Sequence, residues 1–186
     1  MSGLELKKDP QNEMKVTDDY YGNRENYNYV KRLIELLAIF SKEGCDSIID
    51  VGSREVDIIS KLPLYTKVSI DLARPLVADG VKSIKDDFLN YHTEELFDIV
   101  CCFQTLEHIN EVEKFTVKLF GLAKKYVFIS VPYQWREGFC REHVHDPVDE
   151  LKLEKWTKRK PIIQEVIFDG SFPRLICVYQ ITSAEP

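Results

Sequence analysis

The sequence lacks long apolar runs and blocks of basic residues. No apolar stretch among its 186 residues approaches the length of a membrane-spanning helix, and Met1–Lys15 contains no apolar segment of the signal-peptide type. The densest basic stretch, Lys155–Lys160, is short, and the net charge is −6. Non-specific binding to nucleic acid needs a concentrated basic face. We therefore expect a cytoplasmic protein that binds neither a membrane nor nucleic acid.

Cysteines arranged for disulfides or for a metal site are also absent. The five cysteines are odd in number and form no Cys-x-x-Cys pair; they are Cys45, Cys101, Cys102, Cys140 and Cys177. Structural disulfides need paired cysteines, and cysteine-based zinc sites usually contain Cys-x-x-Cys. The pattern predicts buried, reduced thiols, as in cytosolic proteins.

Glycine-rich phosphate-binding loops are missing as well. A dinucleotide site favours Gly-x-Gly-x-x-Gly after a strand, and an ATP-binding P-loop needs Gly-x-x-x-x-Gly-Lys-Ser/Thr. Only Gly52 follows the apolar run Ser47–Val51, and Arg54 stands two residues later. These absences exclude a P-loop and disfavour a nucleotide-dependent oxidoreductase.

The sequence does contain apolar runs that alternate with helical or loop segments. The expected strands are Ser47–Val51, Lys67–Leu72, Val81–Asp86, Phe97–Phe103, Tyr126–Val131, Pro161–Phe168 and Arg174–Ile181. The expected helical segments are Glu25–Lys42, Glu55–Lys61, Arg74–Asp79, Asn110–Lys124 and Val148–Thr157. This order predicts an α/β fold with a parallel sheet between two layers of helices, closed by an antiparallel hairpin. We expect a flexible arm over residues 1–16 and a single domain over residues 17–186.

Acidic residues stand at the ends of the first three expected strands. Asp50 precedes Gly52, Asp71 lies at the end of the second strand, and Asp87-Phe88 follows the third. The carboxyl ends of parallel strands form the ligand-binding edge of such a sheet. A carboxylate at Asp50 repels phosphate and suits an amine, Asp71 is placed to accept from ribose hydroxyls, and Phe88 can pack on an aromatic ring. An adenosyl ligand with an amine and no phosphate fits all three positions.

Six segments occur in the order and spacing of one known family. They are Ile49–Ser53, Ile70–Leu72, Asp86–Phe88, Phe97–Val100, Gln104–Ile109 and Val127–Pro132. With these segments the chain resembles the class I S-adenosylmethionine-dependent methyltransferases, from about Tyr27 to Ile181. The resemblance implies a three-layer Rossmann-like sandwich with a mostly parallel seven-stranded sheet and an antiparallel C-terminal hairpin strand. It also implies S-adenosyl-L-methionine as the cofactor.

The resemblance assigns the cofactor site to residues at the strand ends. Those residues are Asp50, Gly52, Ser53, Asp71, Leu72, Asp87, Phe88, Phe103 and Gln104. Asp50 and Gly52 would line the methionine part of the cofactor, Asp71 would bind the ribose, and Asp87 would flank the adenine. Arg54 departs from the family, which usually has a second glycine there.

Residues elsewhere are candidates for a lid and for the acceptor. In the resemblance, the segment before the first helix folds over the cofactor, and the loop after the fifth strand borders the acceptor. The candidates are Tyr20, Tyr21, Arg24, Glu107, Tyr133 and Trp135. A packing role for the tyrosines and for Trp135 is the alternative.

His143 and His145 are the candidate general bases for a hydroxyl acceptor. Two alternatives stay open: a polar loop that bonds to itself, and a metal pair completed by Asp146 or Glu107. We expect no metal, because metal-dependent members of the family use carboxylates around the fourth strand, and Asp98 lies at the wrong end of it.

The resemblance therefore implies an enzyme that methylates a small-molecule acceptor, with O-methylation of a sugar or a similar metabolite as the leading hypothesis. Bacterial surface-polysaccharide and natural-product enzymes are the nearest analogy. A catalytically weak or inactive scaffold with the same fold is the main alternative, and a nucleotide-dependent oxidoreductase is the other. A homodimer is an open alternative to a monomer.

Overall fold

The computed structural model describes residues 24–182. The predicted arm over residues 1–16 and the candidates Tyr20 and Tyr21 lie outside the described residues. The helices are α2 (Asn28–Phe40), α3 (Val112–Gly121) and α4 (Glu150–Thr157), with short 3-10 turns η2 (Arg24–Asn26) and η3 (Leu106–His108). The strands are β1 (Ser47–Val51), β2 (Thr66–Asp71), β3 (Lys82–Lys85), β4 (Phe97–Phe103), β5 (Ala123–Pro132), β6 (Ile163–Asp169) and β7 (Phe172–Gln180).

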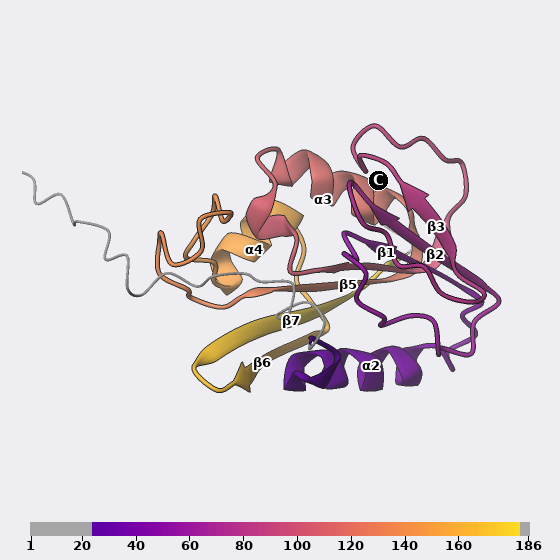
Figure 1. The fold of residues 1–186 in the computed structure, drawn as a ribbon, viewed down its shortest axis with the longest axis horizontal. Helices are drawn as coiled ribbons and strands as arrows, with labels where there is room; N and C mark the ends of the chain where they lie inside the picture. Colours follow the sequence, from indigo (N-terminus) through magenta and orange to yellow (C-terminus); the bar gives the residue numbers. More distant parts are fainter. Residues whose placement is uncertain (1–23, 183–186) are drawn as a thin grey trace, which may run out of the picture.

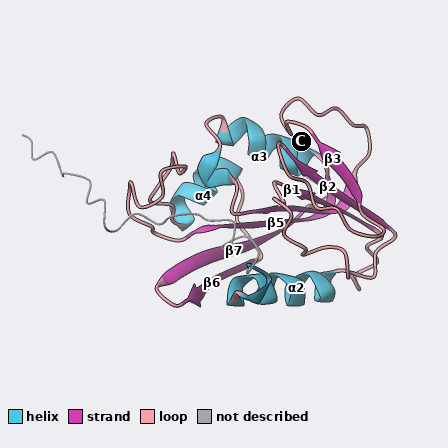
Figure 2. Cartoon of the chain, viewed as in Figure 1, coloured by secondary structure: helices cyan, strands magenta, loops and turns pink. Residues whose placement is uncertain are grey.

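The strands form one seven-stranded sheet in the order β3-β2-β1-β4-β5-β7-β6. The five strands from β3 to β5 are parallel, and β7 pairs antiparallel with both β5 and β6. The sheet confirms the predicted α/β class, its mostly parallel seven strands and its C-terminal hairpin (Figure 2). β1 lies between β2 and β4, so the ends of these three strands meet at the centre of one edge.

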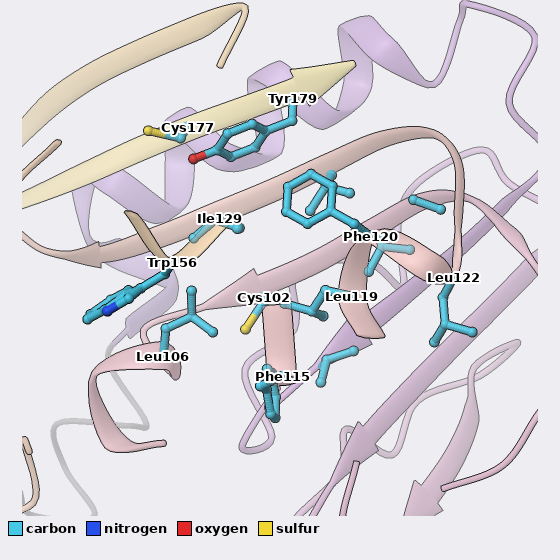
Figure 3. Close-up of a cluster of buried hydrophobic side chains, with 14 of the residues drawn as sticks. Cys102, Leu106, Phe115, Leu119, Phe120, Leu122, Ile129, Trp156, Cys177 and Tyr179 are labelled. Carbon is cyan, nitrogen blue, oxygen red and sulfur yellow. The ribbon is translucent and has the colours of Figure 1, made fainter. Parts of the chain in front are cut away.

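The two faces of the sheet carry different covers. Figure 1 shows α2 on one side of the sheet and α3 and α4 on the other. The cluster on the α3–α4 side includes Phe115, Leu119, Trp156 and Tyr179, which Figure 3 shows between the helices and the strands. The opposite cluster is built from the apolar face of α2, including Leu33 and Leu37, and the other face of the central strands.

The prediction of two helical segments was wrong, because the chain is irregular over both of them, Glu55–Lys61 and Arg74–Asp79. Arg54 and Glu55 have φ angles of 43° and 64°, a region that a right-handed helix does not use. The Asp57 side chain accepts hydrogen bonds from the backbone N–H and hydroxyl of Ser60, a local alternative to helical bonding. The apolar periodicity of the first segment is nevertheless used, since Ile58 and Ile59 are buried in the α2-side cluster.

Two further sequence predictions concern the cysteines and membranes. All five cysteines are buried and free, which confirms the prediction of buried thiols. Among the described residues, no helix combines the length and apolar character that crossing a bilayer requires.

Candidate functional site

A cavity of about 520 Å³ opens at the carboxyl ends of β1, β2 and β4. Residues after all three strands line it together with parts of η2, η3 and the loop between β5 and α4. The lining residues are Arg24, Gly52, Arg54, Asp71, Leu72, Ala73, Arg74, Gln104, Thr105, His108 and Glu142. Of the predicted cofactor residues, the structure brings Gly52, Asp71, Leu72 and Gln104 to this cavity. Arg24, predicted as a lid residue, lies there too.

Gly52 is required at the end of β1 by two features of its backbone. Its φ angle is +80°, and a Cβ atom built on it would lie 2.4 Å from Thr105 Oγ1. Thr105 follows β4, so the contact brings the ends of two neighbouring strands together. A side chain at position 52 would therefore be strained and would push the two sides of the cavity apart.

Asp71 is held by backbone amides from both sides of the cavity. Its Oδ1 accepts from the N–H groups of Ala73 and Arg74, each at 2.8 Å, and its Oδ2 accepts from the N–H of Arg54 at 3.1 Å. Within residues 24–182, Oδ1 thus uses both of its lone pairs, while Oδ2 accepts one hydrogen bond and keeps one acceptor position open.

Asp50 does not line the cavity but is buried two residues before Gly52, which does. The side chain is 1% exposed, and neither carboxylate oxygen has a hydrogen-bond partner among residues 24–182. Burial raises the pKa of Asp50 to about 7, against the opposing effect of the nearby Arg24 guanidinium. The charge of Arg24, which lines the cavity, therefore acts on the buried Asp50 carboxyl.

The other predicted cofactor residues do not line the cavity. Ser53 is buried, with its hydroxyl 2.7 Å from that of Ser69, and Phe103 belongs to the α2-side core. Asp87 accepts hydrogen bonds from Leu89 and Asn90 in its own turn. Phe88 is buried in the opposite core. In this conformation Asp87 and Phe88 organise the loop after β3, and their assignment to adenine stays a prediction.

Glu107, His108 and His143 form a compact cluster beside the cavity. Glu107 and His108 lie in η3, and His143 comes from the loop between β5 and α4; each offers a ligand atom, and the three atoms lie within 4.8 Å of one another. Glu107 is 1% exposed, and burial raises its pKa, while His108 and His143 oppose the shift. Burial disfavours charge on His143, but hydrogen bonds to Asp146 and Cys140 and the nearby Glu107 carboxylate outweigh it and raise its pKa to about 10.

The two candidate bases differ in place. His143 belongs to the cluster and stacks on Trp135 at 5.5 Å between ring centroids. His145 points elsewhere: its Nε2 is 2.8 Å from the carbonyl oxygen of Ile109, and its ring packs against Trp156. These contacts favour a structural role for His145. A general-base role of either histidine stays a prediction.

Tyr133 and Trp135 line a second cavity, of about 540 Å³, beside the β6–β7 hairpin. Its wall is largely aromatic and also contains Phe139, Phe168 and Phe172. Trp135 contacts two basic side chains, because the buried Arg174 guanidinium is 4.3 Å from its ring centroid and His143 stacks on it. Trp135 thereby joins the aromatic cavity to the cluster beside the first cavity.

Solved structures with the same architecture carry bound cofactor at low sequence identity. Magnesium protoporphyrin IX methyltransferase from Synechocystis PCC 6803, with bound SAM, has a TM-score of 0.68 at 11% identity, over 91% of this chain and 86% of that one. The N-methyltransferase NodS from Bradyrhizobium japonicum WM9, in complex with S-adenosyl-L-homocysteine, has a TM-score of 0.68 at 15% identity, over 89% of this chain and 93% of that one. The 1,6-didemethyltoxoflavin-N1-methyltransferase from Burkholderia thailandensis has a TM-score of 0.69 at 12% identity, over 89% of this chain and 85% of that one.

The chain has the class I methyltransferase fold. No protein-family model matches the sequence, and no curated protein is significantly similar to it. The similarity to these solved structures therefore lies in the fold, because the sequence identities are low.

Sequence reasoning missed several residues of the cavity in this methyltransferase fold. Several lining residues were not predicted as site residues, namely Ala73, Arg74, Thr105, His108 and Glu142. Arg74 and Ala73 were assigned to a loop or helical turn, so their amides gave no signal. Thr105 and Glu142 reach the cavity only through tertiary contacts. Arg54 was noticed for breaking the glycine pattern, and the structure adds that its amide holds Asp71.

Proposed function

We propose that the protein transfers a methyl group from S-adenosyl-L-methionine to a small-molecule acceptor. The observation that carries the proposal is the cavity at the ends of β1, β2 and β4, which is lined by Gly52 and Asp71 within a methyltransferase fold. Ligands of open α/β sheets bind at this edge. The volume of about 520 Å³ also lies within the range of pockets for drug-sized ligands, roughly 300–1,000 Å³.

The residues present fit this cofactor in three respects. The acceptor position of Asp71 Oδ2 that is open within residues 24–182 suits a ribose hydroxyl. Arg24 offers a cation to the methionine carboxylate, and the buried Asp50 favours a positively charged group above it. When bound, the cofactor supplies an electrophilic methyl group on a sulfonium. The task of the protein is then to position the acceptor atom and exclude water.

For the acceptor we propose a hydroxyl compound, a sugar or a similar metabolite. The aromatic cavity beside Trp135 supports this, because flat aromatic faces pack well on the apolar faces of small polar molecules. A nitrogen acceptor is the second candidate. Its support is the raised pKa of His143, since an imidazole that keeps its proton at neutral pH cannot take one from a hydroxyl, whereas a free amine needs no base.

Thermal shift distinguishes this proposal from the scaffold and oxidoreductase alternatives. We expect millimolar S-adenosylhomocysteine to raise the melting temperature by several degrees, since a ligand at 100 times its Kd adds about 2.7 kcal/mol of stability. NADH at the same concentration is the matched control and should produce a smaller shift. No shift with S-adenosylhomocysteine would favour the scaffold, and a larger shift with NADH would favour the oxidoreductase.

A panel of acceptors then separates oxygen from nitrogen. Release of S-adenosylhomocysteine with hydroxylated sugars and with their amino-sugar counterparts compares the two acceptor atoms on matched skeletons. The proposal expects turnover with the hydroxyl compounds. Turnover confined to the amino sugars would replace O-methylation by N-methylation.

A further inference from the structure

The cluster of Glu107, His108 and His143 has the composition of a metal site. Two imidazoles and one carboxylate each offer a ligand atom, and the three atoms lie within 4.8 Å of one another. Zn²⁺ and related ions lie roughly 2.0–2.2 Å from nitrogen and oxygen ligands, so ligand atoms around one ion lie less than about 4.4 Å apart. Small side-chain adjustments would therefore bring the three groups onto one ion.

Both histidines are already oriented by groups behind them. His108 Nδ1 lies 2.9 Å from the carbonyl oxygen of Glu142, and His143 Nδ1 lies 2.7 Å from Asp146 Oδ2. Each oxygen accepts a hydrogen bond from Nδ1–H, which leaves Nε2 as the ligand atom, and a metal ion would displace the proton that Nε2 of His143 holds in the free protein. Metal-binding histidines almost always have this arrangement, in which the second ring nitrogen donates to a carboxylate or a carbonyl.

Glu107 supplies the independent sign that a ligand belongs here. The side chain is 1% exposed, and within residues 24–182 its Oε2 has no hydrogen-bond partner. A buried carboxylate oxygen without a partner is unfavourable, and a cation in direct contact would remove that penalty. Asp146 is 1% exposed and lies behind His143, so it is placed as an orienting group rather than as a ligand.

We propose that Glu107, His108 and His143 bind a divalent transition-metal ion of the zinc type at the edge of the cofactor cavity. Two nitrogen ligands and one oxygen ligand suit Zn²⁺ and Co²⁺ better than Ca²⁺ or Mg²⁺, which prefer oxygen. Three protein ligands leave coordination positions open, as in catalytic rather than structural zinc sites. Since His108 lines the cavity, an ion bound by it would lie at the cavity wall.

This inference deepens the proposed function and rests on it for the role of the ion. An acceptor hydroxyl that coordinates the ion has a lower pKa, and its proton passes to water. Metal binding would thus activate a hydroxyl without a neutral histidine base. It would also select acceptors with a hydroxyl that can reach the ion.

Cobalt binding to the untagged full-length protein tests the site directly. After removal of bound metal with a chelator, we expect one equivalent of Co²⁺ to give visible absorption bands, and Zn²⁺ to abolish them by displacement. Glu107→Gln and His108→Ala should each weaken Co²⁺ binding by about 100-fold or more. Asp146→Asn should weaken it by about 10- to 100-fold, the usual effect of removing an orienting group.

His92→Ala is the matched control, because His92 is exposed and lies outside the cluster. It should leave the Co²⁺ bands and the affinity unchanged. Absence of the bands in the wild-type protein, or equal affinity in His108→Ala and the wild type, would overturn the proposal. The His108 side chain is 33% exposed, so its replacement is compatible with folding even where a change at Glu107 is not.

The same samples keep the two proposals separate. Stabilisation by S-adenosylhomocysteine without Co²⁺ binding would remove the metal site and leave the methyltransferase proposal standing. Co²⁺ binding without any response to S-adenosylhomocysteine would do the reverse. If both occur, methyl transfer to a hydroxyl acceptor should fall at least 10-fold in His108→Ala, while the Kd for S-adenosylhomocysteine changes less than threefold.

Discussion

The two faces of the sheet are covered by different kinds of structure. On one face α3 and α4 pack side by side, and Thr116 Oγ1 of α3 donates to the carbonyl oxygen of Trp156 in α4. On the other face α2 is joined by irregular segments, residues 52–65 after β1 and residues 72–81 after β2. Their apolar side chains enter the core, while side chain-to-backbone hydrogen bonds replace those of a helix. The comparison shows that the irregular segments supply the part of the cavity wall in which backbone amides hold Asp71, because these amides are not used in a helix.

Asp50 offers the largest expected effect on this irregular face. Its pKa is raised by burial to about 7, so the folded protein binds a proton between roughly pH 4 and 7 that the unfolded chain releases. This lowers the free energy of unfolding as the pH rises through that window. The stability of Asp50→Asn minus that of the wild type should therefore grow by about 4 kcal/mol from pH 4 to pH 7.

Urea denaturation at several pH values measures this difference. Asp79→Asn, a change at an exposed carboxylate, is the control and should give a nearly constant offset. A constant offset for Asp50→Asn as well would mean that burial does not raise the pKa of Asp50 above that of the unfolded chain.

Gly52→Ala should have the next largest effect. The new Cβ atom would meet Thr105 at 2.4 Å, and the φ angle of +80° disfavours a side chain. Together these should lower the free energy of unfolding by about 3 kcal/mol and displace the walls of the cavity. Gly170→Ala is the matched control, because its φ angle is +61° with nothing within 4 Å. Equal losses in the two variants would contradict the close approach of β1 and β4.

A pair of buried hydroxyls compares the faces more finely. Ser69 Oγ accepts from the Leu76 amide and bonds Ser53, whereas Thr116 ties α3 to α4. Ser69→Ala and Thr116→Ala should each lower the free energy of unfolding by about 1–2 kcal/mol. Only Ser69→Ala should weaken S-adenosylhomocysteine binding, by roughly threefold to tenfold, because Ser69 holds both irregular segments that line the cavity. Calorimetric titration of S-adenosylhomocysteine into both variants measures this difference. Equal affinities would mean that the cavity does not depend on the hydrogen bonds of Ser69.

The sequence predicted the parts of the fold that depend on local pattern. The seven strands, the three main helices and the closing hairpin follow from apolar periodicity and short loops. The irregular segments were mistaken for helices because their apolar spacing is used for burial, while Asp57, Ser60 and the positive φ angles at Arg54 and Glu55 decide the backbone. Periodicity reports burial and leaves such local competition unseen.

The site residues also fall into those that local pattern predicts and those that it does not. Gly52, Asp71, Leu72 and Gln104 directly follow or end strands, so their place at the cavity could be predicted from strand order. The cluster beside the cavity combines Glu107 and His108 of η3 with His143, which lies more than 30 residues later in the chain. The geometry of the cluster therefore depends on where the loop that carries His143 folds back. The loop between β5 and α4 has no periodic pattern that could have fixed this position.

Calorimetric titration of S-adenosylhomocysteine into the wild type and Asp71→Asn tests the central claim most directly, namely that the cavity held together at Asp71 is the cofactor site. We expect micromolar binding to the wild type and about 100-fold weaker binding to Asp71→Asn, since the variant loses the negative charge and replaces Oδ2, the acceptor for the Arg54 amide, by an NH2 group that can only donate. Asp79→Asn should bind as the wild type does. Equal affinity of Asp71→Asn and the wild type, or no binding to either, would contradict the claim.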